Sequence, residues 1–439
     1  MPTSYTPAAC QSRPEGAPWS LTWTGPPGLD RTSTQRRARC ATRVPRTVLI
    51  LHSSAGRYGA DLLLLAIAEG IDRDRWRPLC VLPERGELVP LLEAAGAEVV
   101  VHPLAVLRRT LSGPAGALGL ARALAADRRK IGALARRREV AVVHSNTSVV
   151  LSGEAIARAA GVRHLMHVRE IYQGAGGRGA EGLWPLFRRR LLRAEAVVCM
   201  SRAIADQFQG SHKAFVMYDG VTRSPSPQPV RRETARELLG VPADRFAVAL
   251  IGRVSDWKGQ DVLARALAQP ALSEIGAFGL LAGDAAPGYE EAARRLDRLA
   301  LELDVEDRLI RLGFRDDVET VLAAADALTV PSTRPEPFGL VALEGALAGL
   351  PVVASGHGGV TEIVREGRTG RLVAPGDPAA LAGALRALAE DPASAAAMGG
   401  AGSRDVTERF DRARTLQQLQ AVYDRLAEPT KERRRLWSR

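Results

Sequence analysis

Two periods of apolar residues alternate along the chain. From residue 46 onward, short apolar runs typical of buried strands are each followed by a stretch whose apolar residues lie three and four positions apart, as in a helix. Strands and helices that alternate in this way form a parallel sheet, because each helix carries the chain back to the edge where the last strand began. The predicted strands are 47–51, 76–82, 98–101, 140–145, 164–168, 196–201, 246–251, 278–282, 309–312, 327–330 and 351–355.

The helices predicted between these strands complete two series of alternating elements. They cover 60–70, 88–95, 115–138, 152–161, 184–194, 260–268, 289–303, 318–325 and 340–349. The segment Ser-Pro-Ser-Pro-Gln-Pro at 224–229 separates the two series, and proline pushes the residue before it towards extended backbone. A length of 439 residues also favours two or three domains over one. We therefore predict an α/β protein with two Rossmann-like doubly wound domains, 46–229 and 230–409.

Both ends of the chain lack this alternation. Residues 1–45 are rich in Pro, Ser, Thr, Gly and Arg, a composition that offers little apolar surface to offset the entropy of ordering. We predict a disordered basic tail there and a second basic tail at 429–439. Between the second domain and that tail, 410–428 has apolar residues at helical spacing and is predicted to be an amphipathic helix.

The charge is divided unevenly between the two domains. The formal net charge is +11, yet 47–229 holds 25 basic and 16 acidic residues, whereas 230–427 holds 23 and 29. A single basic groove for nucleic acid would place the excess on one continuous surface, so this division disfavours it. A basic half suits an anionic surface or acceptor.

Cysteine usage and hydropathy limit the cellular location. The four cysteines lack the CxxC spacing, and two of them lie in strand-like runs, which predicts free thiols in a reducing compartment. No apolar run reaches the roughly 18 to 20 residues of a spanning helix. We expect a cytoplasmic protein. The runs 128–138 and 184–193 mix arginines with apolar residues, so peripheral contact with the inner membrane face is a further expectation, although such runs are usually solvated faces.

Common sequence motifs give little support to other enzyme classes. Residues 174–179 satisfy GxGxxG, but they lie several residues beyond a strand and lack the acidic residue of a dinucleotide site. Asp72-Arg-Asp74 fits a solvated turn better than a metal site. P-loop, HExxH and GxSxG motifs are absent from the sequence.

Two basic residues stand where the first strand of the second domain ends. Arg253 follows strand 246–251, and Lys258 precedes the next helix. Ligands of open α/β sheets bind at the carboxyl ends of strands, and two cations there would neutralise a diphosphate. Lys258 is one of only four lysines in the chain. On spacing alone, a solvated helix start explains Lys258 equally well.

A second cluster lies between strand 327–330 and the helix at 340–349. Glu336 stands in a turn between two prolines, Gly339 precedes a helix whose free N–H groups suit phosphate, and Glu344 lies inside that helix. A carboxylate binds sugar hydroxyls better than it binds a phosphate, because the carboxylate and the phosphate are both negative and repel each other. Alone, the cluster also fits a Pro-rich turn with two solvated carboxylates. Together with the basic pair, it indicates recognition of a nucleotide sugar.

These residues resemble the family four glycosyltransferases of the GT-B fold, whose signature is two glutamates separated by seven residues. Glu336 and Glu344 have that spacing, Arg253 and Lys258 match the preceding basic pair, and 358–364 looks like the family's Gly-Gly-x-x-Glu segment. The resemblance covers about residues 46 to 428. It implies transfer of a sugar from a nucleoside diphosphate sugar to a glycan or lipid-linked acceptor, with retention of configuration, and a helix 410–428 that crosses back to the first domain.

The resemblance also implies roles for individual residues. Arg253 and Lys258 would stabilise the leaving diphosphate in place of a metal, Glu336 would orient the sugar, and His167 would lie near the transferred sugar. We therefore expect no metal and no cofactor beyond the donor substrate. The remaining donor-binding residues implied by the family are Gly59, Gly313, Phe314, Phe338, Gly339, Leu340 and Glu344. Tyr58 stands where many members have a glycine.

Three alternatives stay open at this point. A GT-B-fold sugar-nucleotide epimerase would bind the same donor, a noncatalytic scaffold would bind it without turnover, and a polyanion-binding module would depend on the basic tails. The sequence carries no readable code for the sugar, the nucleotide, the acceptor or the oligomeric state.

Overall fold

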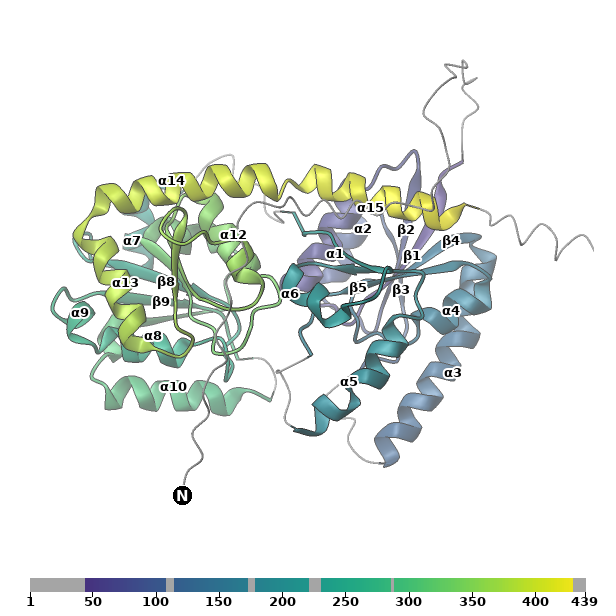
Figure 1. Ribbon diagram of the computed structural model, residues 1–439, viewed down its shortest axis with the longest axis horizontal. Helices are drawn as coiled ribbons and strands as arrows, with labels where there is room; N and C mark the ends of the chain where they lie inside the picture. Colours follow the sequence, from purple (N-terminus) through teal and green to yellow (C-terminus); the bar gives the residue numbers. More distant parts are fainter. Residues whose placement is uncertain (1–43, 108–113, 173–177, 221–229, 286–287, 429–439) are drawn as a thin grey trace, which may run out of the picture. The chain divides into compact units, whose positions relative to one another are not determined.

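Two parallel sheets organise the structure, a computed structural model that describes residues 44–107, 114–172, 178–220, 230–285 and 288–428. Within these ranges, the first sheet has seven strands in the order β3-β2-β1-β4-β5-β6-β7, and the second has six in the order β10-β9-β8-β11-β12-β13 (Figure 1). The pairs at the centre of each sheet, such as β1 with β4 and β8 with β11, are parallel. The predicted fold class, two doubly wound α/β domains, is confirmed.

The strands lie close to their predicted positions. The first sheet consists of β1 (Arg46–Leu51), β2 (Trp76–Leu82), β3 (Glu98–Val101), β4 (Val140–Ser145), β5 (Arg163–Val168), β6 (Ala196–Cys199) and β7 (Ala214–Val216). The second consists of β8 (Ala247–Ile251), β9 (Phe278–Ala282), β10 (Leu309–Gly313), β11 (Ala327–Val330), β12 (Val352–Ser355) and β13 (Gly370–Val373). Central strands such as β1 and β11 are almost wholly buried because helices cover both faces of each sheet.

The helices between the strands also follow the predicted pattern. In the first half they are α1 (Gly59–Gly70), α2 (Leu88–Ala94), α3 (Pro114–Arg137), α4 (Gly153–Ala160), α5 (Arg178–Leu191) and α6 (Arg202–Ala205). In the second half they are α7 (Arg232–Leu239), α8 (Gln260–Leu267), α9 (Pro270–Ser273), α10 (Glu290–Glu302), α11 (Val318–Ala324), α12 (Leu340–Leu347), α13 (Pro378–Glu390), α14 (Pro392–Arg409) and α15 (Arg412–Ala427). Short 3-10 turns occur at Asp206–Phe208, Glu306–Arg308 and Gly359–Glu362.

The structure departs from the predicted elements in several places. Helix α5 begins at Arg178, before the predicted start at 184, and Pro185 lies inside it. Proline favours the first turn of a helix, whereas Pro185 has helical residues on both sides. The pattern assigned no elements to the parts of the chain that form α6, β7, α7, α9, β13, α13 and α14. Connector 224–229, tail 429–439 and nearly all of tail 1–45 lie outside the described residues, so the domain limits stay predictions.

Helix α15 follows the second sheet in sequence but packs on the first. Its buried Leu416, Leu419 and Tyr423 join the apolar cluster that covers β1 and β2. The Tyr423 hydroxyl lies 2.8 Å from His144 Nδ1 on β4, and the Tyr423 ring lies 5.3 Å from that of Trp76. The helix predicted to cross back to the first domain therefore does so.

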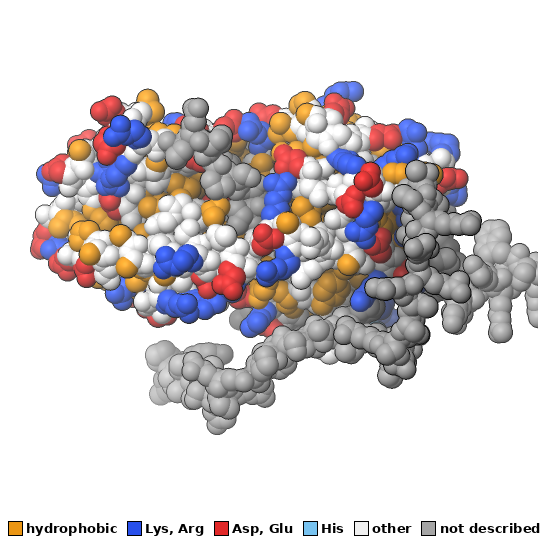
Figure 2. Space-filling model, turned by 90° about the horizontal axis from the view of Figure 1, so that it is seen from above, with side chains coloured by type: hydrophobic (Ala, Val, Ile, Leu, Met, Phe, Trp, Pro, Cys, Tyr) orange, Lys and Arg blue, Asp and Glu red, His pale blue; other side chains and the backbone are white. Residues whose placement is uncertain are grey.

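The face that carries α14 and α15 mixes both signs of charge. Acidic and basic side chains are interspersed where described residues are visible (Figure 2). Arg412 Nη2 lies 2.6 Å from Glu69 Oε2, and Arg75 pairs with Asp424, so several of these charges are partnered across elements. Interspersed charge of this kind offers no continuous basic groove. None of the helices in the described ranges is long and apolar enough to span a membrane.

Candidate active site

The second sheet reverses its strand order between β8 and β11, and a polar cluster occupies this point. In open α/β sheets a crevice opens at such a reversal, beyond the carboxyl ends of the strands. Lys258, in the loop after β8, places Nζ 2.7 Å from Glu336 Oε1, and Ser332, just after β11, donates to the same oxygen at 2.6 Å. The Thr333 amide donates to the Trp257 carbonyl at 2.8 Å, which ties the two loops together. The structure thus brings the predicted Lys258 and Glu336 into direct contact.

Glycines fix the turn that carries Glu336. The Gly359 amide donates to the Glu336 carbonyl at 2.7 Å. A Cβ at Gly358, where φ is +72°, would lie 2.5 Å from that carbonyl oxygen, so the loop after β12 can approach the turn only as glycine. Glu336 is 3% exposed, and a carboxylate so buried needs the partners that Lys258 and Ser332 supply. Contacts within the protein therefore fix the position of the Glu336 carboxylate.

Sequence reasoning missed two residues of this cluster. Ser332 donates to Glu336, and His357 Nε2 donates to the Ser332 carbonyl at 2.9 Å. A carbonyl oxygen only accepts, so Nε2 carries the proton. Ser332 and His357 each lie two residues beyond a predicted strand, at 327–330 and 351–355, so the position after a strand was a usable signal for both.

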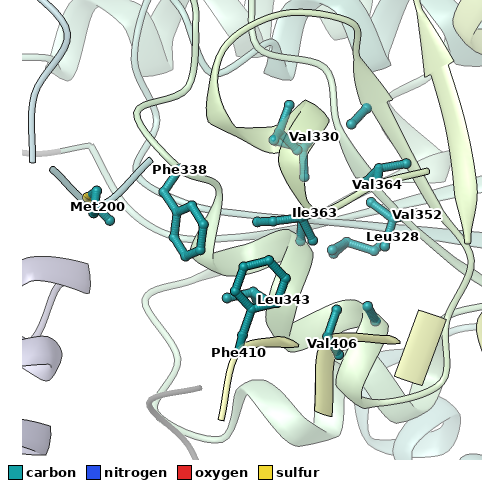
Figure 3. Close-up of a cluster of buried hydrophobic side chains, with 14 of the residues drawn as sticks. Met200, Leu328, Val330, Phe338, Leu343, Val352, Ile363, Val364, Val406 and Phe410 are labelled. Carbon is teal, nitrogen blue, oxygen red and sulfur yellow. The ribbon is translucent and has the colours of Figure 1, made fainter. Parts of the chain in front are cut away.

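The helix start predicted for phosphate is present. Gly339 precedes α12 with φ +100°, and Leu340 is the first residue of the helix. Phe338 is 1% exposed and packs with Leu343 and Phe410 in the buried cluster of Figure 3. The Phe338 ring is therefore part of the core, and this residue can contact a ligand only through its backbone. Glu344 lies half-buried inside α12.

A second group of predicted residues gathers around Tyr58. The guanidinium of Arg253 lies over the Tyr58 ring, 4.9 Å from its centroid, and the Phe314 ring meets Tyr58 edge to face at 5.9 Å. Gly313, directly before Phe314, adopts φ +66°. A Cβ at Gly59 would lie 3.3 Å from Leu340 Cδ1, so the loop after β1 closely approaches the start of α12. Tyr58, which stands where many family members have a glycine, therefore packs against the guanidinium of Arg253.

His167 lies in a buried polar cluster of the first sheet. It is 1% exposed, stacks on His144 with centroids 5.7 Å apart, and accepts a hydrogen bond at Nδ1 from Arg169 Nη2 at 3.2 Å. Burial, and next the Arg169 charge, hold the pKa of His167 well below its ordinary value, so the imidazole is neutral at pH 7. Its Nε2 has no hydrogen-bond partner. The role expected of it at the transferred sugar stays a prediction.

Within the described ranges, no three His, Cys, Asp or Glu side chains come together as metal ligands would. In the candidate site, the Lys258 ammonium is the cation that pairs with Glu336, with Nζ 2.7 Å from Oε1.

The second domain matches a known protein family. The family model for glycosyl transferases group 1 matches residues 231–405. A D-inositol 3-phosphate glycosyltransferase from Saccharomonospora viridis is 34% identical over 262 residues, which are 56% of this chain and 60% of that protein. The chain spans less than two thirds of the length of the curated relatives it matches.

Solved structures extend the similarity over both domains. Anabaena HepE, in complex with UDP and glucose, is 30% identical with a TM-score of 0.72, and the match covers 86% of this chain and 99% of HepE. The sucrose-phosphate synthase of Thermosynechococcus elongatus, 22% identical with a TM-score of 0.71 and coverages of 87% and 99%, shares the fold. The chain belongs to the family four glycosyltransferases, within the glycosyl transferases group 1, and has the GT-B architecture.

Proposed function

We propose that the protein transfers a sugar from a nucleoside diphosphate sugar to a hydroxyl acceptor, with retention of configuration and without a metal ion. The observation that carries the proposal is the Lys258–Glu336 pair at the strand-order reversal of the second sheet. In the reaction, the bond from the anomeric carbon to the diphosphate oxygen breaks, a bond to the acceptor oxygen forms, and the acceptor proton is released. Anabaena HepE, crystallised with UDP-glucose, supports a UDP-sugar as the donor.

Lys258 can serve the sugar side and the diphosphate side of this site together. Its ammonium has three N–H donors, and one of them is directed at Glu336 Oε1. The ammonium also lies over the Trp257 ring, 4.4 Å from its centroid. Its N–H groups not directed at Glu336 would serve diphosphate oxygens, whose negative charge grows as the anomeric bond breaks. Glu336 would then hold the sugar hydroxyls next to that charge. Arg253, released from the Tyr58 ring or shared with it, would supply the second cation.

The remaining donor contacts follow from the same placement. The α12 start would meet the diphosphate through the backbone of Phe338, Gly339 and Leu340. Glu344 would accept from the ribose hydroxyls, and the turn at Gly313 and Phe314 would hold the base. Gly59 would bring the loop after β1 to the donor, and His167 would contact the transferred sugar.

Donor binding and metal independence can be measured together. We expect UDP-sugars to raise the thermal unfolding midpoint of the protein and to be hydrolysed slowly to UDP, and we expect both effects to persist in excess EDTA. GDP- and ADP-sugars serve as competing donors. Loss of turnover in EDTA, with recovery on adding Mg²⁺ or Mn²⁺, would contradict the metal-free mechanism. An epimerised sugar nucleotide in place of a new glycoside would assign the protein to the epimerases.

The first domain also carries an exposed apolar and basic surface that supports peripheral binding to an anionic membrane, with a cytoplasmic location. On α5, Leu183 and Leu186 are 65% and 70% exposed, and Arg189 lies on the same stripe, each three residues from the last. Solvent-exposed leucines next to an arginine are typical of a helix that lies on an anionic lipid surface. An acceptor carried on a lipid would be reached from this surface.

Vesicle binding distinguishes this surface from an ordinary solvated helix. We expect cosedimentation with phosphatidylglycerol vesicles, weaker binding to phosphatidylcholine alone, and a clear loss in the double variant Leu183→Ser/Leu186→Ser. The matched control is Leu238→Ser/Leu301→Ser, two leucines of the acidic half that are 68% and 63% exposed. Equal binding by both double variants would refute the membrane role of α5.

A further inference from the structure

The Arg253 guanidinium is held by an aromatic ring and not by an ion pair. Its Cζ lies 4.9 Å from the centroid of the Tyr58 ring, and the arginine side chain is exposed. Among the described residues, the guanidinium has no carboxylate, carbonyl or hydroxyl partner. Arg295, in contrast, pairs with Asp256 of the same loop after β8. Tyr58 is therefore the group that orders the charged end of Arg253.

Packing on a ring leaves a guanidinium ready to bind an anion. The attraction is between the positive charge and the negative face of the ring, so it engages none of the five N–H donors in a hydrogen bond. A carboxylate partner would occupy two of those donors and would repel a phosphate. The Tyr58 ring can thus order Arg253 while the N–H donors stay available to a diphosphate.

The loop that carries Tyr58 is fixed from within the first domain. Asp61 is 2% exposed, its Oδ2 accepts from the Tyr58 amide at 2.9 Å, and its Oδ1 accepts from Ser54 Oγ at 2.5 Å. His52 Nε2 donates to the same Oδ1 at 2.8 Å, because His52 Nδ1 accepts from Asn146 Nδ2 at 3.1 Å and so carries no proton. One buried carboxylate therefore sets the backbone position of Tyr58.

Two further contacts join this loop to the turn after β10. The Phe314 ring meets the Tyr58 ring edge to face, with centroids 5.9 Å apart, and Arg57 Nη1 lies 2.6 Å from Asp316 Oδ2. Arg253 follows β8 and Phe314 follows β10, and only β9 separates these strands in the sheet. A donor with its base at Phe314 and its diphosphate at Arg253 would therefore extend beside the Tyr58 ring.

We propose that Tyr58 is a positioning residue of the donor site, and that it holds Arg253 over its ring so that the guanidinium is preorganised for the donor diphosphate. This inference rests on the proposed transfer reaction and adds a residue of the first domain to the donor site. Preorganisation strengthens binding because a long, exposed side chain otherwise loses rotamer freedom when the ligand arrives. Tyr58 acts through Arg253, so its effect on the donor must vanish when Arg253 is absent.

A double-mutant cycle tests this coupling. The dissociation constant for UDP is measured for the wild-type protein, Tyr58→Leu, Arg253→Ala and the double variant. We expect Tyr58→Leu to weaken UDP binding by about two- to fivefold, the range for an exposed cation–π pair. In the Arg253→Ala protein, the same change should alter UDP binding by less than about 1.5-fold. The kcat/KM for UDP-glucose hydrolysis should follow the dissociation constant for UDP.

Uridine separates this effect from a change in the base site. Uridine carries no diphosphate, so its dissociation constant, measured by ligand-observed NMR, should be the same in Tyr58→Leu and the wild-type protein. Tyr58→Phe keeps the ring and removes only the hydroxyl, so it should recover most of the UDP affinity that Tyr58→Leu loses. Should Tyr58→Leu unfold, Tyr58→Gly provides the same comparison, because the backbone at φ −93° and ψ 173° is extended.

Each outcome decides one of the two proposals. If the wild-type protein neither binds nor hydrolyses any nucleotide sugar, the proposed transfer reaction fails. If a nucleotide sugar other than a UDP-sugar binds, its nucleoside diphosphate and nucleoside replace UDP and uridine in the cycle. Unchanged or tighter UDP binding by Tyr58→Leu, an equal loss with and without Arg253, an equal loss for uridine, or a Tyr58→Phe protein as weak as Tyr58→Leu overturns the positioning role of Tyr58.

Discussion

Replacing Glu336 with alanine is expected to lower kcat for UDP release from UDP-glucose by about 100- to 1000-fold, the range measured when one group is removed from a preorganised electrostatic site. The carboxylate accepts from both Lys258 and Ser332, so its loss leaves the ammonium without the partner that positions it. Glu336→Gln keeps an oxygen for Ser332 but removes the charge that holds Lys258. We expect it to be less impaired than Glu336→Ala.

The control for this experiment is Glu390→Ala. Glu390 is an exposed carboxylate at the end of α13, paired with Arg386 on its own helix. An exposed pair of this kind contributes about 0 to 1 kcal/mol, so turnover should stay at the wild-type level. Turnover by Glu336→Ala within about threefold of the control, in protein with an unchanged unfolding midpoint, would remove Glu336 from the mechanism.

The sequence predicted the two residues of this pair but not the contact between them. Lys258 and Glu336 were each found from their place after a strand, because the carboxyl ends of parallel strands share one edge. Periodicity does not say how far each side chain reaches across that edge, and so the 2.7 Å contact between them was not predicted. Ser332 and His357 were missed for the same reason. The Ser332 contact spans four residues within one loop, and the His357 contact joins two loops 25 residues apart.

Arg253 shows a second limit of sequence reasoning. Its position predicted a cation for the diphosphate, and the structure adds that Tyr58 lies beneath it. These residues are separated by most of the first domain, so no local pattern links them. The departure of Tyr58 from the family glycine was visible in the sequence, but its meaning required the fold. Helix limits failed for a more local reason, since Pro185 lies inside α5 and not at its first turn.

The two sheets share one design. Each reverses its strand order between its first strand and the strand that begins the second half of the series, and each has a carboxylate held by a serine beyond that point. In the second sheet Ser332 donates to Glu336, and in the first Ser148 donates to Glu170. Lys258 adds a second partner in the second sheet, where its ammonium lies 2.7 Å from Glu336 Oε1.

Gly358→Ala is expected to be strongly disruptive to the site. At φ +72° and ψ −162° the backbone is in a region open almost only to glycine, which costs about 1–3 kcal/mol for alanine. The new Cβ would also lie 2.5 Å from the Glu336 carbonyl oxygen, and relieving such a contact typically costs about 1–3 kcal/mol more. Because the Glu336 turn must move, we expect both a lower unfolding midpoint and a loss of UDP release.

Gly376→Ala is the matched control, with φ +72° and nothing within 4 Å of the added Cβ, so it carries backbone strain alone. Equal losses of stability and turnover in the two variants would show that the close approach of Gly358 does not position Glu336.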